Sequence, residues 1–327
     1  MEPTPNLEGI EETRERRHIA WGVVGLCLFA IMLYKGVKNN PPEALLRVMP
    51  EVAVVQPPPA PPKEDPFKDI FLKAKSAYVL DLSSQTVLFE RNSKQQLPLA
   101  SLTKIMTAIV AGKLVPKDTK ITISRQDLKQ EGDNGLLLGE KWKLDDLIRF
   151  TLLVSSNDGA HALASALASV KGTTTPVTRT DFIAYMNEYA KKIGLEKTRF
   201  VNETGLDEDN GVSGGYGSAE DVAKLFIFAK ENYPEVFDIT KEKSHAFMSD
   251  DNVVHEGTNT NKIIETIPGI MASKTGLTDL AGGNLAVEFM PQENHPVVIV
   301  VMGSSTQGRF DDMDALVKAT EKYFASN

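Results

Sequence analysis

Two residues near the first third of this 327-residue chain have the types and spacing of a nucleophile and its base. Ser101 and Lys104 stand three positions apart, and residues i and i+3 of a helix share one face, so the hydroxyl and the amine are expected within hydrogen-bond range. A serine activated by a neutral amine can form a covalent acyl intermediate. This Ser-x-x-Lys pattern occurs once in the chain. The pair therefore predicts acyl transfer through Ser101.

Two further groups of polar residues follow in the chain. One contains Ser155 and Asn157, and the other is Lys274-Thr275-Gly276. Burial, together with the positive charge of Lys274, is expected to lower the pKa of Lys104 and keep it neutral. A helix that begins at Ser101 would add backbone N–H groups that stabilise developing negative charge. Each motif alone is a weak signal, but three in this order indicate one catalytic site.

The elements that must position these residues follow from hydrophobic patterning. Residues 77–90 form two short β-rich runs around a polar turn, which is typical of a hairpin. Strand patterns return only near the C-terminus, after a long stretch of amphipathic helices. We therefore predict an α/β (α+β) fold, in which one antiparallel sheet built from both ends of the chain is flanked by helices and joined to an all-helical insertion. The expected helices are 102–112, 144–154, 158–170, 222–230 and 311–324, and the later strands are 283–289 and 296–302.

The N-terminal segment predicts a membrane anchor. Residues 19–34 carry no charge, arginines precede them, and no small-x-small cleavage site follows. We expect a cytoplasmic tail at 1–18, an uncleaved transmembrane signal anchor at 19–35 and a proline-rich linker at 36–66. The expected catalytic body is 67–327, with its helical part at roughly 105–262.

Composition excludes several classes of function. The net charge is −8 and no basic stripe is present outside the N-terminus, so nucleic acid is not an expected partner. The single cysteine, Cys27, allows no internal disulfide, and the five histidines show no metal-ligand spacing. We expect neither a metal nor another cofactor.

The sequence around the three motifs resembles the D-alanyl-D-alanine carboxypeptidases, the low-molecular-mass penicillin-binding proteins with Ser-x-x-Lys, Ser-x-Asn and Lys-Thr-Gly signatures. The similarity runs from Ala77 to Phe324 and implies a β-lactamase/DD-peptidase-like fold. It is carried by the segments Pro98–Ala108, Leu153–Ala160, Phe200–Leu206 and Pro268–Thr278.

The resemblance also implies roles for individual residues. The backbone N–H groups of Ser101 and Leu277 would form the oxyanion hole, and Ser155 would relay a proton to the leaving D-alanine. Asn157 would hold Lys104 and the substrate amide. Lys274, Thr275 and Gly276 would bind the substrate at its C-terminal carboxylate. The implied substrate is the pentapeptide of peptidoglycan, β-lactam antibiotics would acylate the same serine, and the implied location is the outer side of a bacterial cell membrane.

Two alternatives within this chemistry remain open. Such carboxypeptidases often carry an arginine between two asparagines upstream of Lys-Thr-Gly, but Thr260 stands there in this chain. An endopeptidase that cuts the cross-link between D-alanine and a diamino acid is therefore an alternative. A serine β-lactamase is another, because Glu203-Thr204-Gly205-Leu206-Asp207 approximates the loop that carries a deacylating glutamate. A non-catalytic wall-binding module is disfavoured by the intact motifs.

Overall fold

The computed structural model describes residues 65–132, 135–167 and 178–326. All of them belong to one compact unit that spans Pro62–Asn327. The predicted anchor at 19–35, and the linker up to residue 64, lie outside the described residues. Within the described part of the chain, no helix is both long and apolar enough to cross a membrane.

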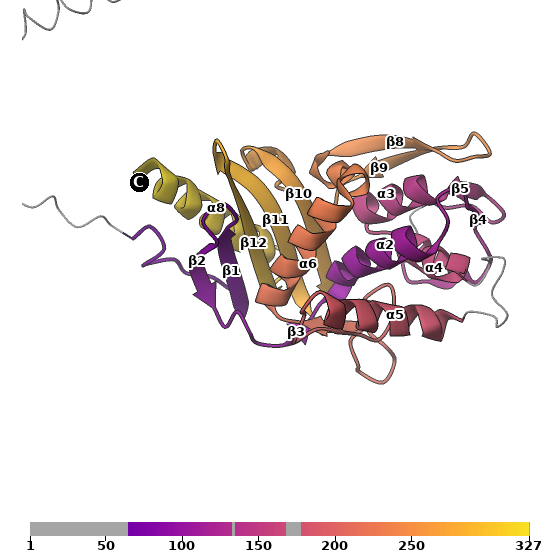
Figure 1. Cartoon of the computed structure of the whole chain (residues 1–327), viewed down its shortest axis with the longest axis horizontal. Helices are drawn as coiled ribbons and strands as arrows, with labels where there is room; N and C mark the ends of the chain where they lie inside the picture. The colour runs from indigo at the N-terminus through magenta and orange to yellow at the C-terminus, as the bar shows by residue number, and fades with distance from the viewer. Residues whose placement is uncertain (1–64, 133–134, 168–177, 327) are drawn as a thin grey trace, which may run out of the picture. The chain divides into compact units, whose positions relative to one another are not determined.

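The centre of this unit is a five-stranded antiparallel sheet in the order β10-β11-β12-β1-β2 (Figure 1). β1 pairs with β12, so strands from the two ends of the catalytic body lie side by side, as predicted. β1 also pairs with β2, which confirms the predicted hairpin. The strands are β1 (Ser76–Asp81), β2 (Thr86–Arg91), β10 (Ile270–Thr278), β11 (Gly282–Gln292) and β12 (His295–Ser304).

Both faces of this sheet are covered. Val298, Val300 and Met302 of β12 pack into the core shared with the helices of the middle region. Their neighbours Val297, Ile299 and Val301 pack on the opposite face, in the core formed with the C-terminal helix α8 (Gly308–Ser326). Because side chains alternate along a strand, a strand buried on both faces has to be apolar throughout. This explains the unbroken Val/Ile run of β12.

The middle of the chain forms a helical layer around α2. α2 is buried along most of its length, which gives the site a fixed support. α2 packs against α3, α4, α5 and α6. The helices are α2 (Thr103–Leu114), α3 (Leu144–Val154), α4 (Asn157–Ala166), α5 (Arg179–Lys192), α6 (Ala219–Asn232) and α7 (Pro234–Phe237).

The prediction that the insertion is all-helical is wrong. Three small antiparallel sheets lie among its helices, in the orders β3-β7-β6, β4-β5 and β8-β9. Only one face of the β8-β9 ribbon is buried, where Phe247 packs edge-on against Phe150. Strands this short give too few residues for their alternation to be detected in the sequence. Their bounds are β3 (Leu97–Pro98), β4 (Lys120–Thr122), β5 (Lys141–Lys143), β6 (Arg199–Phe200), β7 (Gly215–Gly217), β8 (Ser244–Met248) and β9 (Val254–Thr258).

Candidate active site

Ser101 lies in the 3-10 turn Ala100–Leu102, which leads directly into α2. The residue before it, Ala100, has φ of +48° although it is not glycine. Such left-handed backbone is uncommon for a residue with a side chain and is found preferentially at functional sites. The sharp turn therefore places Ser101 at the start of a buried helix, as the sequence predicted.

Lys104 is fully buried and its amine has three partners. Nζ lies 3.0 Å from Ser101 Oγ, 2.6 Å from Asn157 Oδ1 and 2.6 Å from the carbonyl oxygen of Thr204. The amide oxygen of Asn157 and the carbonyl of Thr204 are acceptors only. If the amine of Lys104 is neutral, its two N–H groups donate to these two acceptors. Its lone pair is then free to accept the hydroxyl proton of Ser101. This is the arrangement that a base for Ser101 requires.

The electrostatics of the site favour a neutral Lys104. Burial lowers the pKa of Lys104 to about 7, while the carboxylate of Glu203 opposes this shift. Burial also lowers the pKa of Lys274 well below its usual value, with further contributions from the charges of Lys104 and Arg309. Burial was the expected cause at Lys104. The effect of the Lys274 charge on the pKa of Lys104 stays a prediction.

Ser155 and Asn157 occupy the bend between α3 and α4. Ser155 ends α3 with φ of +62°, and the hydroxyl of Ser156 caps α4 by accepting a hydrogen bond from Gly159 N. Because Ser156 performs the capping, the hydroxyl of Ser155 is available to accept a hydrogen bond from Lys274 Nζ at 2.8 Å. Asn157 bridges two segments, since its Nδ2 donates to the carbonyl of Glu131 at 2.6 Å while its Oδ1 holds Lys104.

The Lys-Thr-Gly motif lies on β10, the edge strand of the central sheet. A Cβ atom on Gly276 would lie 2.9 Å from Leu99 O and 3.2 Å from Ser101 N. Glycine therefore allows β10 to pass directly beside the turn that carries Ser101. Leu277 follows at once and is 43% exposed. The contribution of the Leu277 N–H to an oxyanion hole stays a prediction.

Thr260, which replaces the expected arginine, adjoins this strand. Its hydroxyl lies 2.5 Å from the hydroxyl of Thr275. A neutral hydroxyl pair thus stands where the resemblance would place a cation that binds the terminal carboxylate. Lys274 is then the basic residue of the Lys-Thr-Gly motif itself.

Sequence reasoning missed several residues that hold the site together. Arg309 of α8 is buried and donates to Gly276 O at 2.6 Å. Asn284 of β11 donates to the carbonyls of both Pro98 and Leu99 at 3.0 Å, which ties the turn of Ser101 to the sheet. The sequence did offer a signal for Asn284, because it is a polar residue near the start of a largely apolar strand. Nothing local to the sequence marks Arg309 or the carbonyl of Thr204.

The comparisons with known proteins agree with this geometry. The profile of the D-alanyl-D-alanine carboxypeptidases of peptidase family S11 matches residues 63–306. The chain is 31% identical to D-alanyl-D-alanine carboxypeptidase DacF of Bacillus subtilis over 72% of its own length and 58% of that protein. It is 30% identical to the D-alanyl-D-alanine endopeptidase of Escherichia coli, over 69% of this chain and 70% of that one.

Solved structures show the same fold. A penicillin-binding protein homologue from Mycobacterium tuberculosis matches with a TM-score of 0.68 and 27% identity, over 84% of this chain and 97% of that one. Penicillin-binding protein D2 of Listeria monocytogenes, solved with ampicillin bound, matches with a TM-score of 0.65 and 27% identity, over 77% of this chain and 98% of that one. The chain belongs to the D-alanyl-D-alanine carboxypeptidase family of serine peptidases.

Proposed function

We propose that this protein is a serine-type D-Ala-D-Ala carboxypeptidase that acts on the pentapeptide stems of peptidoglycan. The observation that carries the proposal is the environment of Lys104, whose buried amine is aimed at Ser101 by two acceptors, Asn157 and the carbonyl of Thr204. Family membership supports the same activity. The chain spans about three fifths of the length of the carboxypeptidase DacF that it matches, so the activity of that whole protein is a proposal for this chain.

The proposed reaction has two halves. In the first, neutral Lys104 takes the proton of Ser101, and Oγ bonds to the carbonyl carbon of the penultimate D-alanine. The N–H groups of Ser101 and Leu277 stabilise the oxyanion. Ser155, held by Lys274, relays that proton from Lys104 to the nitrogen of the terminal D-alanine as the C–N bond breaks, and Lys104 is neutral again. In the second half, Lys104 takes a proton from the water that attacks the ester and returns it to Ser101 Oγ as the ester C–O bond breaks, which releases the shortened peptide.

Covalent labelling and product analysis test this proposal together. A fluorescent penicillin is expected to label the parent protein but not Ser101→Ala, since the lactam acylates the hydroxyl that the substrate uses. Incubation with purified muropeptides is expected to remove one alanine, as measured by mass. Equal labelling of Ser101→Ala would show that the nucleophile is another residue.

A DD-endopeptidase is the second candidate, because Thr260 replaces the arginine that commonly helps to bind a free carboxylate and an endopeptidase is among the relatives. The muropeptide experiment separates the two activities. Monomers formed from cross-linked dimers indicate an endopeptidase, and loss of one alanine indicates a carboxypeptidase.

The β-lactamase alternative depends on Glu203. This carboxylate is fully buried, and both of its oxygens accept hydrogen bonds from Arg179 Nε, at 3.0 and 2.7 Å. A carboxylate that is paired in this way is poorly suited to activate a water. We expect one equivalent of penicillin to be consumed in a burst, followed by little turnover, and Glu203→Gln to change neither phase substantially at neutral pH. Rapid turnover that disappears in Glu203→Gln would establish a β-lactamase.

We further propose that residues 19–35 anchor the protein in a bacterial cell membrane, with the catalytic body on the outer side. The charge-free segment and the proline-rich spacer after it support this proposal. The protein is expected to remain with membranes after a high-salt wash, and protease added from outside is expected to digest its body. A shortened soluble form that begins after residue 35 would identify a cleaved signal peptide.

A further inference from the structure

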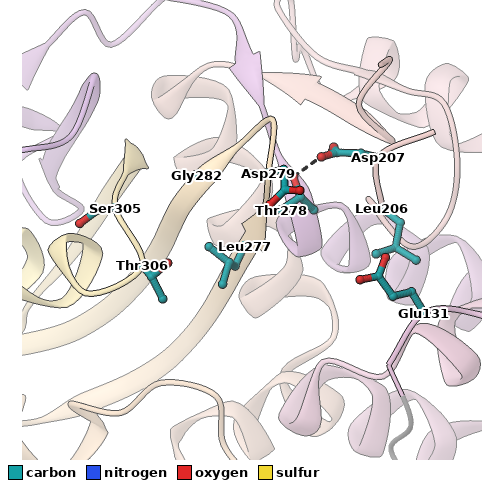
Figure 2. A pocket seen from close by; sticks show the side chains of 9 residues that line it. All are labelled: Glu131, Leu206, Asp207, Leu277, Thr278, Asp279, Gly282, Ser305 and Thr306. Carbon is teal, nitrogen blue, oxygen red and sulfur yellow. Dashed lines mark hydrogen bonds between the residues drawn. The ribbon is translucent and has the colours of Figure 1, made fainter. Parts of the chain in front are cut away.

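A pocket of about 530 Å³ opens beside the candidate active site (Figure 2). Leu277, whose N–H belongs to the proposed oxyanion hole, is part of its wall. In the close-up, Leu277 lies between Ser305 and Thr306 on one side and Leu206 on the other. None of the contacts described for Ser101 and Lys104 involves the lining side chains. The lining residues are Glu131, Leu206, Asp207, Leu277, Thr278, Asp279, Gly282, Ser305 and Thr306.

The direction of β10 indicates which part of a substrate this pocket meets. Lys274 and Thr275 are the proposed partners of the terminal carboxylate, and Leu277 is the proposed partner of the scissile carbonyl. β10 ends at Thr278, and Asp279 stands in the turn just beyond it, on the side away from the leaving D-alanine. A peptide extended along β10 would bring the residue that precedes D-Ala-D-Ala to this pocket.

The lining of the pocket selects for a particular side chain at that position. Glu131, Asp207 and Asp279 are acidic, and none of the nine lining residues is basic. Leu206 and Leu277 supply apolar surface of the kind that methylene groups contact. Carboxylates around a concave surface concentrate cations there. An alkyl chain that ends in an ammonium group matches both features.

The carboxylate of Asp207 has a fixed position. It accepts hydrogen bonds from Thr278 Oγ1 at 3.0 Å and from Leu280 N at 2.9 Å, and Figure 2 shows the first of these. These bonds join the segment that holds Lys104 to the end of β10. The side chains of Glu131 and Asp279 are exposed and remain available at the rim.

We propose that this acidic pocket binds the free ω-amino group of the diamino acid that precedes D-Ala-D-Ala in the stem peptide. This inference rests on the proposed function and adds a preference for substrates in which that amine is charged. Stems whose amine is already acylated in a cross-link would lose the interaction. The enzyme would accordingly favour stems that have not yet served as amine acceptors in cross-linking.

Two synthetic peptides test the inference with the purified full chain. One is Nα-acetyl-L-Lys-D-Ala-D-Ala, and the other carries an additional acetyl group on the ε-amine. We expect kcat/KM to be roughly fivefold to twentyfold higher for the free amine, since several partly exposed carboxylates each contribute modestly. The preference should weaken as salt is raised, because exposed charges are screened.

Substitutions assign the effect to the pocket. In the double variant Asp279→Asn with Glu131→Gln, the ratio of the two kcat/KM values is expected to fall towards one. Asp118→Asn is the matched control, because Asp118 is an exposed aspartate in the turn beyond the far end of α2, and it should keep the parent ratio. Equal kcat/KM values for the two peptides in the parent, or an unchanged ratio in the double variant, would overturn the inference while leaving the proposed function intact. Failure of the parent both to cleave either peptide and to bind penicillin would overturn the proposed function and this inference with it.

Discussion

Lys104→Met is expected to slow acylation by penicillin by roughly 10³-fold, which is within the range that a positioned general base contributes. Methionine fills a similar volume without an amine, so Ser101 loses the group proposed to accept its proton. The acceptors Asn157 Oδ1 and Thr204 O lose their donor as well. The measurement is the second-order rate of labelling by a fluorescent penicillin, accompanied by the melting temperature to verify folding.

The pH dependence of the same rate provides an independent readout. Lys104 acts as a base only when neutral, and burial lowers its pKa to about 7. The rate of the parent is therefore expected to fall about tenfold for each pH unit below 7 and to level off above it. Lys104→Met should lose this dependence.

Lys117→Met is the matched control, because Lys117 is exposed in the turn that follows α2. It should label at the parent rate. A folded Lys104→Met protein that labels within tenfold of the parent would rule out Lys104 as the base.

Gly205→Ala is expected to lower both the stability and the labelling rate. An added Cβ would lie 1.9 Å from Ala100 O and 2.8 Å from Thr103 Oγ1, and the backbone there has φ of +81°. The clash and the strain together are expected to cost about 3 kcal/mol or more in the free energy of unfolding. For a domain of this size, the melting temperature should fall by roughly 6–12 °C. Because Ala100 directly precedes Ser101, the proposed nucleophile, relief of the clash should also displace Ser101.

Gly211→Ala separates the two causes. Gly211 has a similar φ of +75°, but no atom lies within 4 Å of its added Cβ. The free energy of unfolding of Gly211→Ala should therefore fall by only about 1 kcal/mol, from backbone strain, and the variant should keep the parent labelling rate. If the two variants lose the same stability and the same labelling rate, the close approach of Gly205 to Ala100 has no effect beyond the backbone strain.

Local sequence signals were sufficient for the main elements. The Val/Ile run of β12 and the hairpin of β1 and β2 were predicted because burial on the sheet imposes an apolar or alternating pattern. α3 was predicted with the bounds that the structure has, Leu144–Val154, because its apolar face follows the helical period. The β8-β9 ribbon was missed, since five residues with one buried face leave too short a pattern.

For the site, the sequence by itself determined which residue types are present and in what order: a serine with a lysine three positions on, then Ser155 with Asn157, then Lys-Thr-Gly. Helical periodicity was enough to place Ser101 beside Lys104. Only the tertiary structure decided how that amine is aimed, because one of its acceptors is the backbone carbonyl of Thr204, 100 positions away, and every residue has such a carbonyl. It likewise decided that Arg309 and Asn284 hold the neighbouring backbone and that an acidic pocket adjoins Leu277. These contacts join distant segments, and their energies depend on burial, which no local pattern records.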